Sequence, residues 1–245
     1  MSLTSILFTV FFYLAVSLCL VGVTLKIIQY ATTPAPLKIP IAPAPLTRFG
    51  VILRMMREVF LFSSLYRASR WTWLFGWLFH WALVLLFIRH LPYFWPGETP
   101  ELLRQAQPLK YASVPLIFGL TGLLARRFFV DRVRYISAPS DYLLLLLLIA
   151  IGLTGMLMTF AQYYPDMSKV YSFSEGLITF DWSELPSEGV FLAHIFMVFI
   201  LIAIFPISKM LHAPGIFFSP TLNQIDNARK KRHLSGWAQE KEKKE

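Results

Sequence analysis

Four of the five histidines in this chain lie in two apolar, aromatic-rich stretches, residues 71–94 and residues 189–211 with the residue that follows. These four are His80, His90, His194 and His212. Ionisable side chains are costly inside a bilayer and usually mark a functional site there. Imidazole pairs also fill both axial positions of haem iron in electron carriers, because a six-coordinate iron has no open site for a substrate. The pattern therefore predicts axial ligands of two haems stacked through a membrane.

The histidine spacing suggests how the ligands pair. His80 and His90 are ten residues apart, about 15 Å of helix, whereas His194 and His212 are eighteen apart, about 27 Å along a straight helix. If the two stretches run antiparallel, His80 pairs with His212 near one face and His90 with His194 near the other. The separations differ by about 12 Å for straight helices, and tilt and a bend near Pro206 would absorb part of this difference.

Simpler interpretations remain open for each of these residues. A single histidine in the membrane is as often an interhelical hydrogen-bonding group as a ligand. A zinc or copper site would gather its ligands in one small volume, which the spacing along each stretch does not allow. Small residues permit helices to approach closely, so several glycines either admit a flat porphyrin or simply pack helices. These glycines are Gly76, Gly119, Gly122, Gly152 and Gly155.

Four cations are candidate partners for the negatively charged haem propionates. Arg89 is the candidate near the outer face, and Arg126, Arg127 and Lys209 are the candidates near the inner face. The alternative is that these residues are anchors whose side chains snorkel to the membrane surface.

The composition indicates an all-α integral membrane protein. The chain of 245 residues is 56% hydrophobic and 15% charged, and its mean hydropathy is +0.56, whereas soluble domains are about 25% charged. About 20 apolar residues suffice to span a bilayer, which predicts a bundle of five transmembrane helices. The expected spans are residues 3–28, 71–94, 111–130, 141–162 and 189–211. They form a membrane domain over residues 1–216, followed by a cytoplasmic polar tail at 217–245.

Loop charges predict the orientation of these spans. Residues 29–70 carry six Lys or Arg against one Glu, and residues 126–134 carry four Arg against one Asp. Residues 163–188 instead carry five acidic residues against one Lys. The positive-inside rule therefore places the N-terminus outside and the C-terminus inside, and excludes nucleic-acid binding as the reason for the net charge of +9. Residues 48–70 are expected to form an amphipathic segment at the cytoplasmic interface, as a lipid anchor or a docking surface.

Cysteine usage limits the redox chemistry of the chain. Its single cysteine, Cys19, cannot hold an iron–sulfur cluster. There is no C-x-x-C-H motif, so any haem is bound non-covalently. Further electron carriers would therefore belong to partner subunits. The fifth histidine, His233, lies in the basic tail and is expected to be solvated.

The five spans and the histidine spacings of ten and eighteen resemble the gamma (cytochrome b) subunit of respiratory nitrate reductase. The segments EVFLFSSLYRASRWTWLFGWLFH (58–80) and FSPTLNQIDNARKKRH (218–233) are most similar to a branch of that family, the M subunit of the Dsr (sulfite reduction-associated) membrane complex DsrMKJOP. The membrane subunit of heterodisulfide reductase is a further relative of this branch.

The resemblance implies two haem b groups, with His80 and His212 holding the cytoplasmic-side haem and His90 and His194 the outer one. It implies a quinone or quinol site, for menaquinone or ubiquinone, near the outer haem, although no sequence motif marks that pocket. It also implies a cytoplasmic iron–sulfur partner (DsrK-like), a second membrane subunit (DsrP-like), and periplasmic-side haem c and iron–sulfur subunits (DsrJ- and DsrO-like). The expected setting is dissimilatory sulfur metabolism in a prokaryotic cytoplasmic (inner) membrane.

Two other function classes stay open at this point. One is a cytochrome b of another quinone-linked oxidoreductase, of the nitrate reductase, heterodisulfide reductase or hydrogenase type. The other is a cofactor-free membrane anchor or transporter. Transporters often show internal repeats, and no repeat is evident in this sequence.

Overall fold

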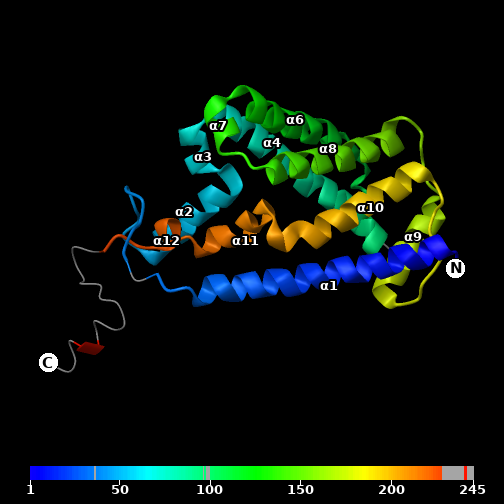
Figure 1. Ribbon diagram of the computed structural model, residues 1–245, viewed down its shortest axis with the longest axis horizontal. Helices are drawn as coiled ribbons and strands as arrows, with labels where there is room; N and C mark the ends of the chain where they lie inside the picture. Colours follow the sequence, from blue (N-terminus) through cyan, green and yellow to red (C-terminus); the bar gives the residue numbers. More distant parts are fainter. Residues whose placement is uncertain (36, 96, 98–99, 228–239, 242–245) are drawn as a thin grey trace. The chain divides into compact units, whose positions relative to one another are not determined.

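The computed structural model describes residues 1–35, 37–95, 97, 100–227 and 240–241, and all regular secondary structure in these residues is helical (Figure 1). Five helical segments are long and apolar enough to cross a membrane, which confirms the expected number of spans. They are Leu3–Thr32, Arg70–Phe94, Glu101–Phe129, Pro139–Phe160 and Gly189–Ile207.

The chain divides into two compact units. The first combines Met1–Cys19 with Ala68–Ile204, and the second combines Leu20–Arg67 with Phe205–Glu245. The long helix α1 (Leu3–Thr32) contributes residues to both units.

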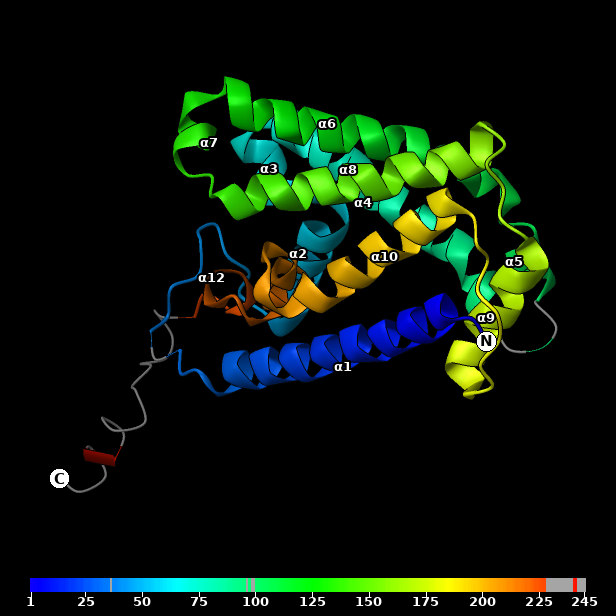
Figure 2. The same ribbon diagram turned by 45° about the vertical axis from the view of Figure 1, so that its right-hand side comes forward.

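Four helices form the body of the first unit. These are α4 (Arg70–His90), α6 (Ser113–Phe129), α8 (Pro139–Phe160) and α10 (Gly189–Ile204). Helix α4 packs along α6, α6 along α8, and α8 along α10, as both views of the ribbon show (Figures 1 and 2). Ser69 caps the start of α4 by accepting a hydrogen bond from the Thr72 amide at 3.4 Å.

Glycines set the close approach of these helices. A Cβ added at Gly119 would lie 2.7 Å from the Phe75 carbonyl oxygen and 3.0 Å from the Phe79 amide nitrogen, both on α4. A Cβ at Gly122 would overlap the Phe75 ring, and one at Gly152 would meet an isoleucine methyl group at 2.6 Å. Gly119, Gly122 and Gly152 therefore act as helix-packing residues, the alternative left open by the sequence.

Shorter elements connect the helices of the first unit. Pro92 ends α4 because proline lacks the amide proton that a continuing helix needs, and the chain passes into the 3₁₀ turn η1 (Leu91–Phe94). Helix α5 (Glu101–Arg104) and the turn η2 (Gln107–Ala112) lead into α6, and α7 (Asp131–Tyr135) leads into α8.

The acidic loop between α8 and α10 contains a helix that the sequence analysis did not anticipate, α9 (Met167–Thr179). Hydrogen bonds tie the start of α1 to this region. The Tyr13 hydroxyl donates to the Leu177 carbonyl at 2.9 Å and accepts from the Trp182 indole at 3.0 Å. The Leu185 amide donates to the Ser5 hydroxyl at 3.0 Å. The N-terminal part of α1 is thus fastened to the loop that precedes α10.

In the second unit, residues 48–68 form two helices where the sequence analysis expected one segment, α2 (Arg48–Leu61) and α3 (Ser63–Ala68). Phe62, between them, has a left-handed backbone with φ of 50°. The buried Glu58 carboxylate accepts hydrogen bonds from the Ser63 hydroxyl at 2.6 Å and from the Ser64 amide at 2.9 Å. Burial opposes ionisation of Glu58, but these bonds and the charge of Arg67 outweigh it and lower the pKa of Glu58.

The fifth span ends earlier than the sequence analysis expected. Helix α10 stops at Ile204 rather than near 211, because Pro206 removes a helical hydrogen bond and disfavours helical geometry in the residue before it. The chain continues as the turns η3 (Phe205–Ile207) and η4 (Lys209–Leu211). His212 then begins α11, so the straight-helix distance between His194 and His212 does not apply.

The rest of the second unit is built from short elements. They are α11 (His212–Gly215), η5 (Ile216–Phe218) and α12 (Pro220–Asn223). The Ile41 amide donates to the Thr221 carbonyl at 3.0 Å, and the Gln224 side chain bonds the backbone of Leu37 and Ile39. The proline-rich linker is therefore held against the start of the tail, whose residues 228–239 and 242–245, His233 among them, lie outside the described residues.

The packing of α4 on α6 predicts that Gly119→Ala destabilises the protein, because the new methyl group would press on the α4 backbone. A cost of about 1–3 kcal/mol is expected for overpacking, measured as a lower melting temperature of the purified protein in detergent. Gly189→Ala is the matched control, since a Cβ at Gly189 meets no atom within 4 Å. Equal melting temperatures for the two variants would contradict this account of the helix contact.

Candidate functional site

Two of the four membrane histidines meet within the first unit. His90 is the last residue of α4, and His194 lies in the first half of α10. Their ring centroids are 6.4 Å apart, and the ring planes are inclined by 12°. His194 is half-buried, and His90 keeps more of its surface exposed. The predicted pairing of His90 with His194 thus corresponds to an observed neighbour relation between two spans.

Hydrogen bonds place the Nδ1 proton on His90 and favour the same tautomer for His194. The Nδ1 atom of His90 is 2.6 Å from the Leu86 carbonyl oxygen, and because a carbonyl only accepts, Nδ1 carries the proton. The Nδ1 atom of His194 is 2.9 Å from the Thr154 hydroxyl oxygen on α8. That hydroxyl has carbonyl acceptors for its own proton. Both rings therefore present an unprotonated Nε2, the form in which a neutral imidazole binds a metal.

The spacing of the two rings fits one metal atom held between them. Imidazole nitrogens bind metals at about 2.0–2.1 Å, which leaves the centroids of two ligands on opposite sides of one atom roughly 6 Å apart. The observed 6.4 Å matches this separation. Metal-binding histidines usually donate their Nδ1 proton to an oxygen acceptor of the protein. The residues present therefore fit an axially ligated haem iron at His90 and His194.

His80 and His212 show the same local arrangement, each within its own unit. His80, in the middle of α4, places Nδ1 2.7 Å from the Gly76 carbonyl oxygen, and His212 places Nδ1 2.7 Å from the Lys209 carbonyl oxygen. Since His80 belongs to the first unit and His212 to the second, their pairing remains a prediction.

The described residues contain no group of three or more His, Cys, Asp or Glu side chains that could hold a metal ion. A multi-ligand protein cage of the zinc type is therefore absent from this part of the chain. Haem iron takes four of its ligands from the porphyrin, so two histidines suffice for it.

The four predicted propionate partners differ in their surroundings. Arg89 is half-buried, and its Nη1 atom is buried with no hydrogen-bond partner among the described residues. Arg127 instead donates to Asp141 at 3.3 Å and to Ser137 at 2.7 Å. Arg126 is half-buried and Lys209 is exposed. Arg89 is thus the candidate with an unmet donor, and a propionate role for any of the four stays a prediction.

Sequence reasoning missed several neighbours of the two rings. The Tyr93 ring lies edge-on to His90 at 5.8 Å and packs against Tyr171 of α9 at 5.2 Å. Gly155 lies beside His194, where an added Cβ would be 3.5 Å from the ring Cε1 atom. Tyr93, one turn after His90, could have been found from helical spacing. Thr154 carries no such signal, because it lies on a different helix, whereas Gly155 was already among the glycines named as possible room for a porphyrin.

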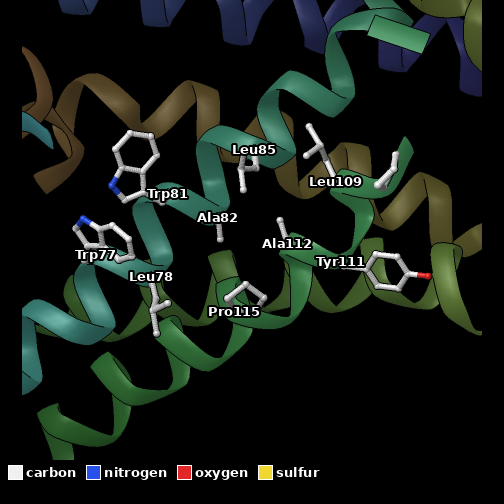
Figure 3. A pocket seen from close by; sticks show the side chains of 10 residues that line it. Trp77, Leu78, Trp81, Ala82, Leu85, Leu109, Tyr111, Ala112 and Pro115 are labelled. Atoms are coloured by element: carbon white, nitrogen blue, oxygen red, sulfur yellow. The ribbon is translucent and has the colours of Figure 1, made fainter. Parts of the chain in front are cut away.

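An apolar cleft of about 390 Å³ opens between α4 and the segment η2–α6 (Figure 3). Its lining is almost entirely hydrocarbon and aromatic, including Trp77, Trp81 and Tyr111. The Tyr111 hydroxyl points away from the other labelled side chains. The cleft therefore suits hydrocarbon chains and offers little to the polar head group of a quinone.

Comparison with known proteins identifies the family. The family model described as nitrate reductase gamma subunit matches residues 44–224. The chain belongs to the nitrate reductase gamma subunit family. The matched region contains all four membrane histidines.

Two curated relatives align with nearly the whole chain. The Hdr-like menaquinol oxidoreductase cytochrome b-like subunit of Archaeoglobus fulgidus is 32% identical, over 92% of this chain and 81% of that protein. The protein of the same description from Archaeoglobus profundus is 30% identical, over 92% of this chain and 80% of that protein. With five apolar helices, this gamma-family chain is a multi-pass membrane protein.

The ion pair between Arg127 and Asp141 predicts a large effect of Asp141→Asn. Asp141 is 2% exposed and also accepts from the Ala138 amide at 3.1 Å. Breaking a buried pair leaves an uncompensated charge and costs about 3–5 kcal/mol, which is measurable as a fall in melting temperature.

Asp131→Asn is the matched control for this substitution. Asp131 pairs with Arg134 at 2.7 Å, but it is 88% exposed, and such surface pairs contribute roughly 0–1 kcal/mol. If Asp131→Asn and Asp141→Asn lowered the melting temperature equally, burial would not explain the loss of stability.

Proposed function

We propose that this chain is a dihaem cytochrome b subunit that carries electrons between the membrane quinone pool and a cytoplasmic iron–sulfur partner. The observation that carries the proposal is the pair of near-parallel imidazoles of His90 and His194, 6.4 Å apart on two membrane spans, each with Nδ1 bound to an oxygen acceptor.

The residues of the chain suit electron carriage rather than substrate chemistry at iron. Haem supplies reversible one-electron transfer when it is bound. His90 and His194 would hold the iron from two sides, which would leave no coordination site for oxygen or substrate. Leu86 and Thr154 hold the ring protons at Nδ1 and keep both Nε2 atoms available. Arg89, the residue before His90, offers a buried donor without a partner among the described residues.

The second haem is proposed at His80 and His212, near the cytoplasmic face. Three facts support it. Both histidines lie within the family match, both have Nδ1 against a backbone carbonyl, and Pro206 interrupts the fifth span between His194 and His212. Arg126, Arg127 and Lys209 are the proposed cations on this side.

The quinone is proposed to be menaquinone, with its site on the outer side near His90 and His194. The printed names of both Archaeoglobus relatives, which describe menaquinol oxidoreductase subunits, support this choice. The same names begin with "Hdr-like", which favours the heterodisulfide reductase-like branch of the family. The proposed setting in dissimilatory sulfur metabolism, as a Dsr M-type subunit, is a finer step that rests on the sequence resemblance.

The proposal of an iron–sulfur partner follows from the cysteine content of the chain. The sequence contains a single cysteine, Cys19, so electrons that leave the inner haem need carriers on another protein. The proposed partners are a DsrK-like iron–sulfur subunit on the cytoplasmic side, a DsrP-like membrane subunit, and DsrJ- and DsrO-like subunits on the periplasmic side.

The proposed orientation places the N-terminus outside and α2 at the cytoplasmic interface. The exposed face of α2 forms an apolar stripe at helical spacing, opposite the buried Val51 and Glu58. Its members are Phe49, Ile52, Leu53, Met56 and Phe60. The exposed Arg48 and Arg57 flank this stripe. An apolar stripe bordered by arginines suits a helix that lies in the headgroup region of a membrane with anionic lipids.

The cofactor proposal predicts two haem b groups per chain in the purified protein. A reduced-minus-oxidised optical spectrum and haem extraction measure them. We expect His90→Ala and His194→Ala to remove the same haem, because each leaves the iron with one axial ligand, and His80→Ala and His212→Ala to remove the other.

The haem that remains in each variant reports that the protein has folded. His233→Ala, in the tail, is the matched control and should keep both haems. Absence of haem from protein made in haem-replete cells would contradict the proposal and favour an anchor or transporter. Loss of the same haem in His80→Ala and in His194→Ala would refute the pairing.

The orientation predicts which positions react with a membrane-impermeant maleimide in intact cells. In a Cys19→Ser background, Ser172→Cys on α9 should be labelled directly. Ile136→Cys, beside the basic helix α7, should be labelled only after the membrane is permeabilised. The reverse pattern would invert the proposed topology.

A further inference from the structure

We infer that Thr154 is a positioning residue for the outer haem, acting through His194 to set the reduction potential of that haem. This inference rests on the proposed haem between His90 and His194 and deepens it. The role comes from a hydrogen bond between two neighbouring helices, α8 and α10.

The acceptors around Thr154 favour one direction for that hydrogen bond. The Thr154 hydroxyl has one proton, and its oxygen lies 2.9 Å from the carbonyl oxygens of both Ala150 and Ile151 on its own helix. Carbonyls only accept, so they share this proton. The hydroxyl oxygen therefore faces Nδ1 of His194, 2.9 Å away, as an acceptor. His194 accordingly donates from Nδ1 and keeps the lone pair on Nε2.

Gly155, the next residue on α8, also lies against the His194 ring. A Cβ at Gly155 would lie 3.5 Å from Cε1 and 3.9 Å from Nδ1 of His194, so the helix surface passes close beside the imidazole. Thr154 thus fixes the rotation of the ring, while Gly155 leaves it room. The contrast with His90 is informative, because His90 bonds a backbone carbonyl of its own helix, which side-chain replacement does not remove.

An acceptor at Nδ1 alters the ligand as well as its orientation. Withdrawal of the Nδ1 proton toward an oxygen makes the ring more basic and a stronger donor at Nε2. A stronger donor stabilises the oxidised, more positively charged iron. The reduction potential of the outer haem should therefore be lower with the Thr154 hydroxyl present than without it.

The experiment is a potentiometric titration of both b haems in the complete protein, with Thr154→Val and Thr154→Ala compared with wild type. We expect the midpoint potential of the outer haem to rise in both variants, while the potential of the inner haem stays unchanged. Thr154→Ser retains the hydroxyl and should restore the wild-type value. The outer haem is identified as the one that His90→Ala removes.

Thr159→Val is the matched control. Thr159 lies on the same helix, and its hydroxyl bonds the carbonyl four residues earlier, Gly155, at 2.8 Å, as Thr154 bonds Ala150. This variant should leave both potentials unchanged. Selective loss of the outer haem in Thr154→Val and Thr154→Ala, restored by Thr154→Ser, would also support the positioning role.

An unchanged outer-haem potential in both Thr154→Val and Thr154→Ala would overturn the inference while leaving the cytochrome b function intact. Equal shifts in Thr159→Val and Thr154→Val would also overturn it, because the effect would then come from helix α8 in general. Wild-type protein without haem at His90 and His194 would instead refute the proposed function itself. The two failures are therefore distinguishable.

Discussion

The separation of 6.4 Å between the near-parallel rings of His90 and His194 is the constraint on which the proposed chemistry depends. These histidines lie on α4 and α10, the two ends of a row in which α4 packs on α6, α6 on α8 and α8 on α10. Any change in one of these three contacts moves one ring relative to the other. The helix packing of the first unit thus also positions the proposed metal ligands.

The contacts between these four helices are set by residues other than the two histidines. Gly119 and Gly122 let α6 approach the backbone and the Phe75 ring of α4. Thr154 links α8 to the His194 ring, and the Arg127–Asp141 pair joins the end of α6 to the start of α8. In a bilayer there is little hydrophobic driving force between helices, so close packing and buried polar links carry their association. The residues that stabilise the bundle are for this reason the same residues that orient the site.

Much of the architecture could be predicted from the sequence, because a bilayer restricts a spanning chain to continuous apolar helices. The five spans were confirmed, as was an interruption near Pro206. The sequence analysis placed the end of the fifth helix too late and did not predict α9, although Val170, Phe173 and Leu177 recur at helical spacing after the N-cap Asp166. It also left open whether the glycines pack helices or admit a cofactor, a choice that depends on which side chains face them.

Composition and order along the chain by themselves determined the membrane class, the number of spans and the identity of the candidate ligands, because these follow from local hydropathy and from the cost of an imidazole in lipid. Only the tertiary structure decided that the His90 and His194 rings lie side by side, that His90 carries its proton on Nδ1, and that the Thr154 hydroxyl lies within hydrogen-bond distance of His194 Nδ1. The physical reason is that a hydrogen bond or a ring separation between helices depends on their mutual rotation. That rotation is set by close contacts among residues far apart in sequence, such as Gly119 and Phe75.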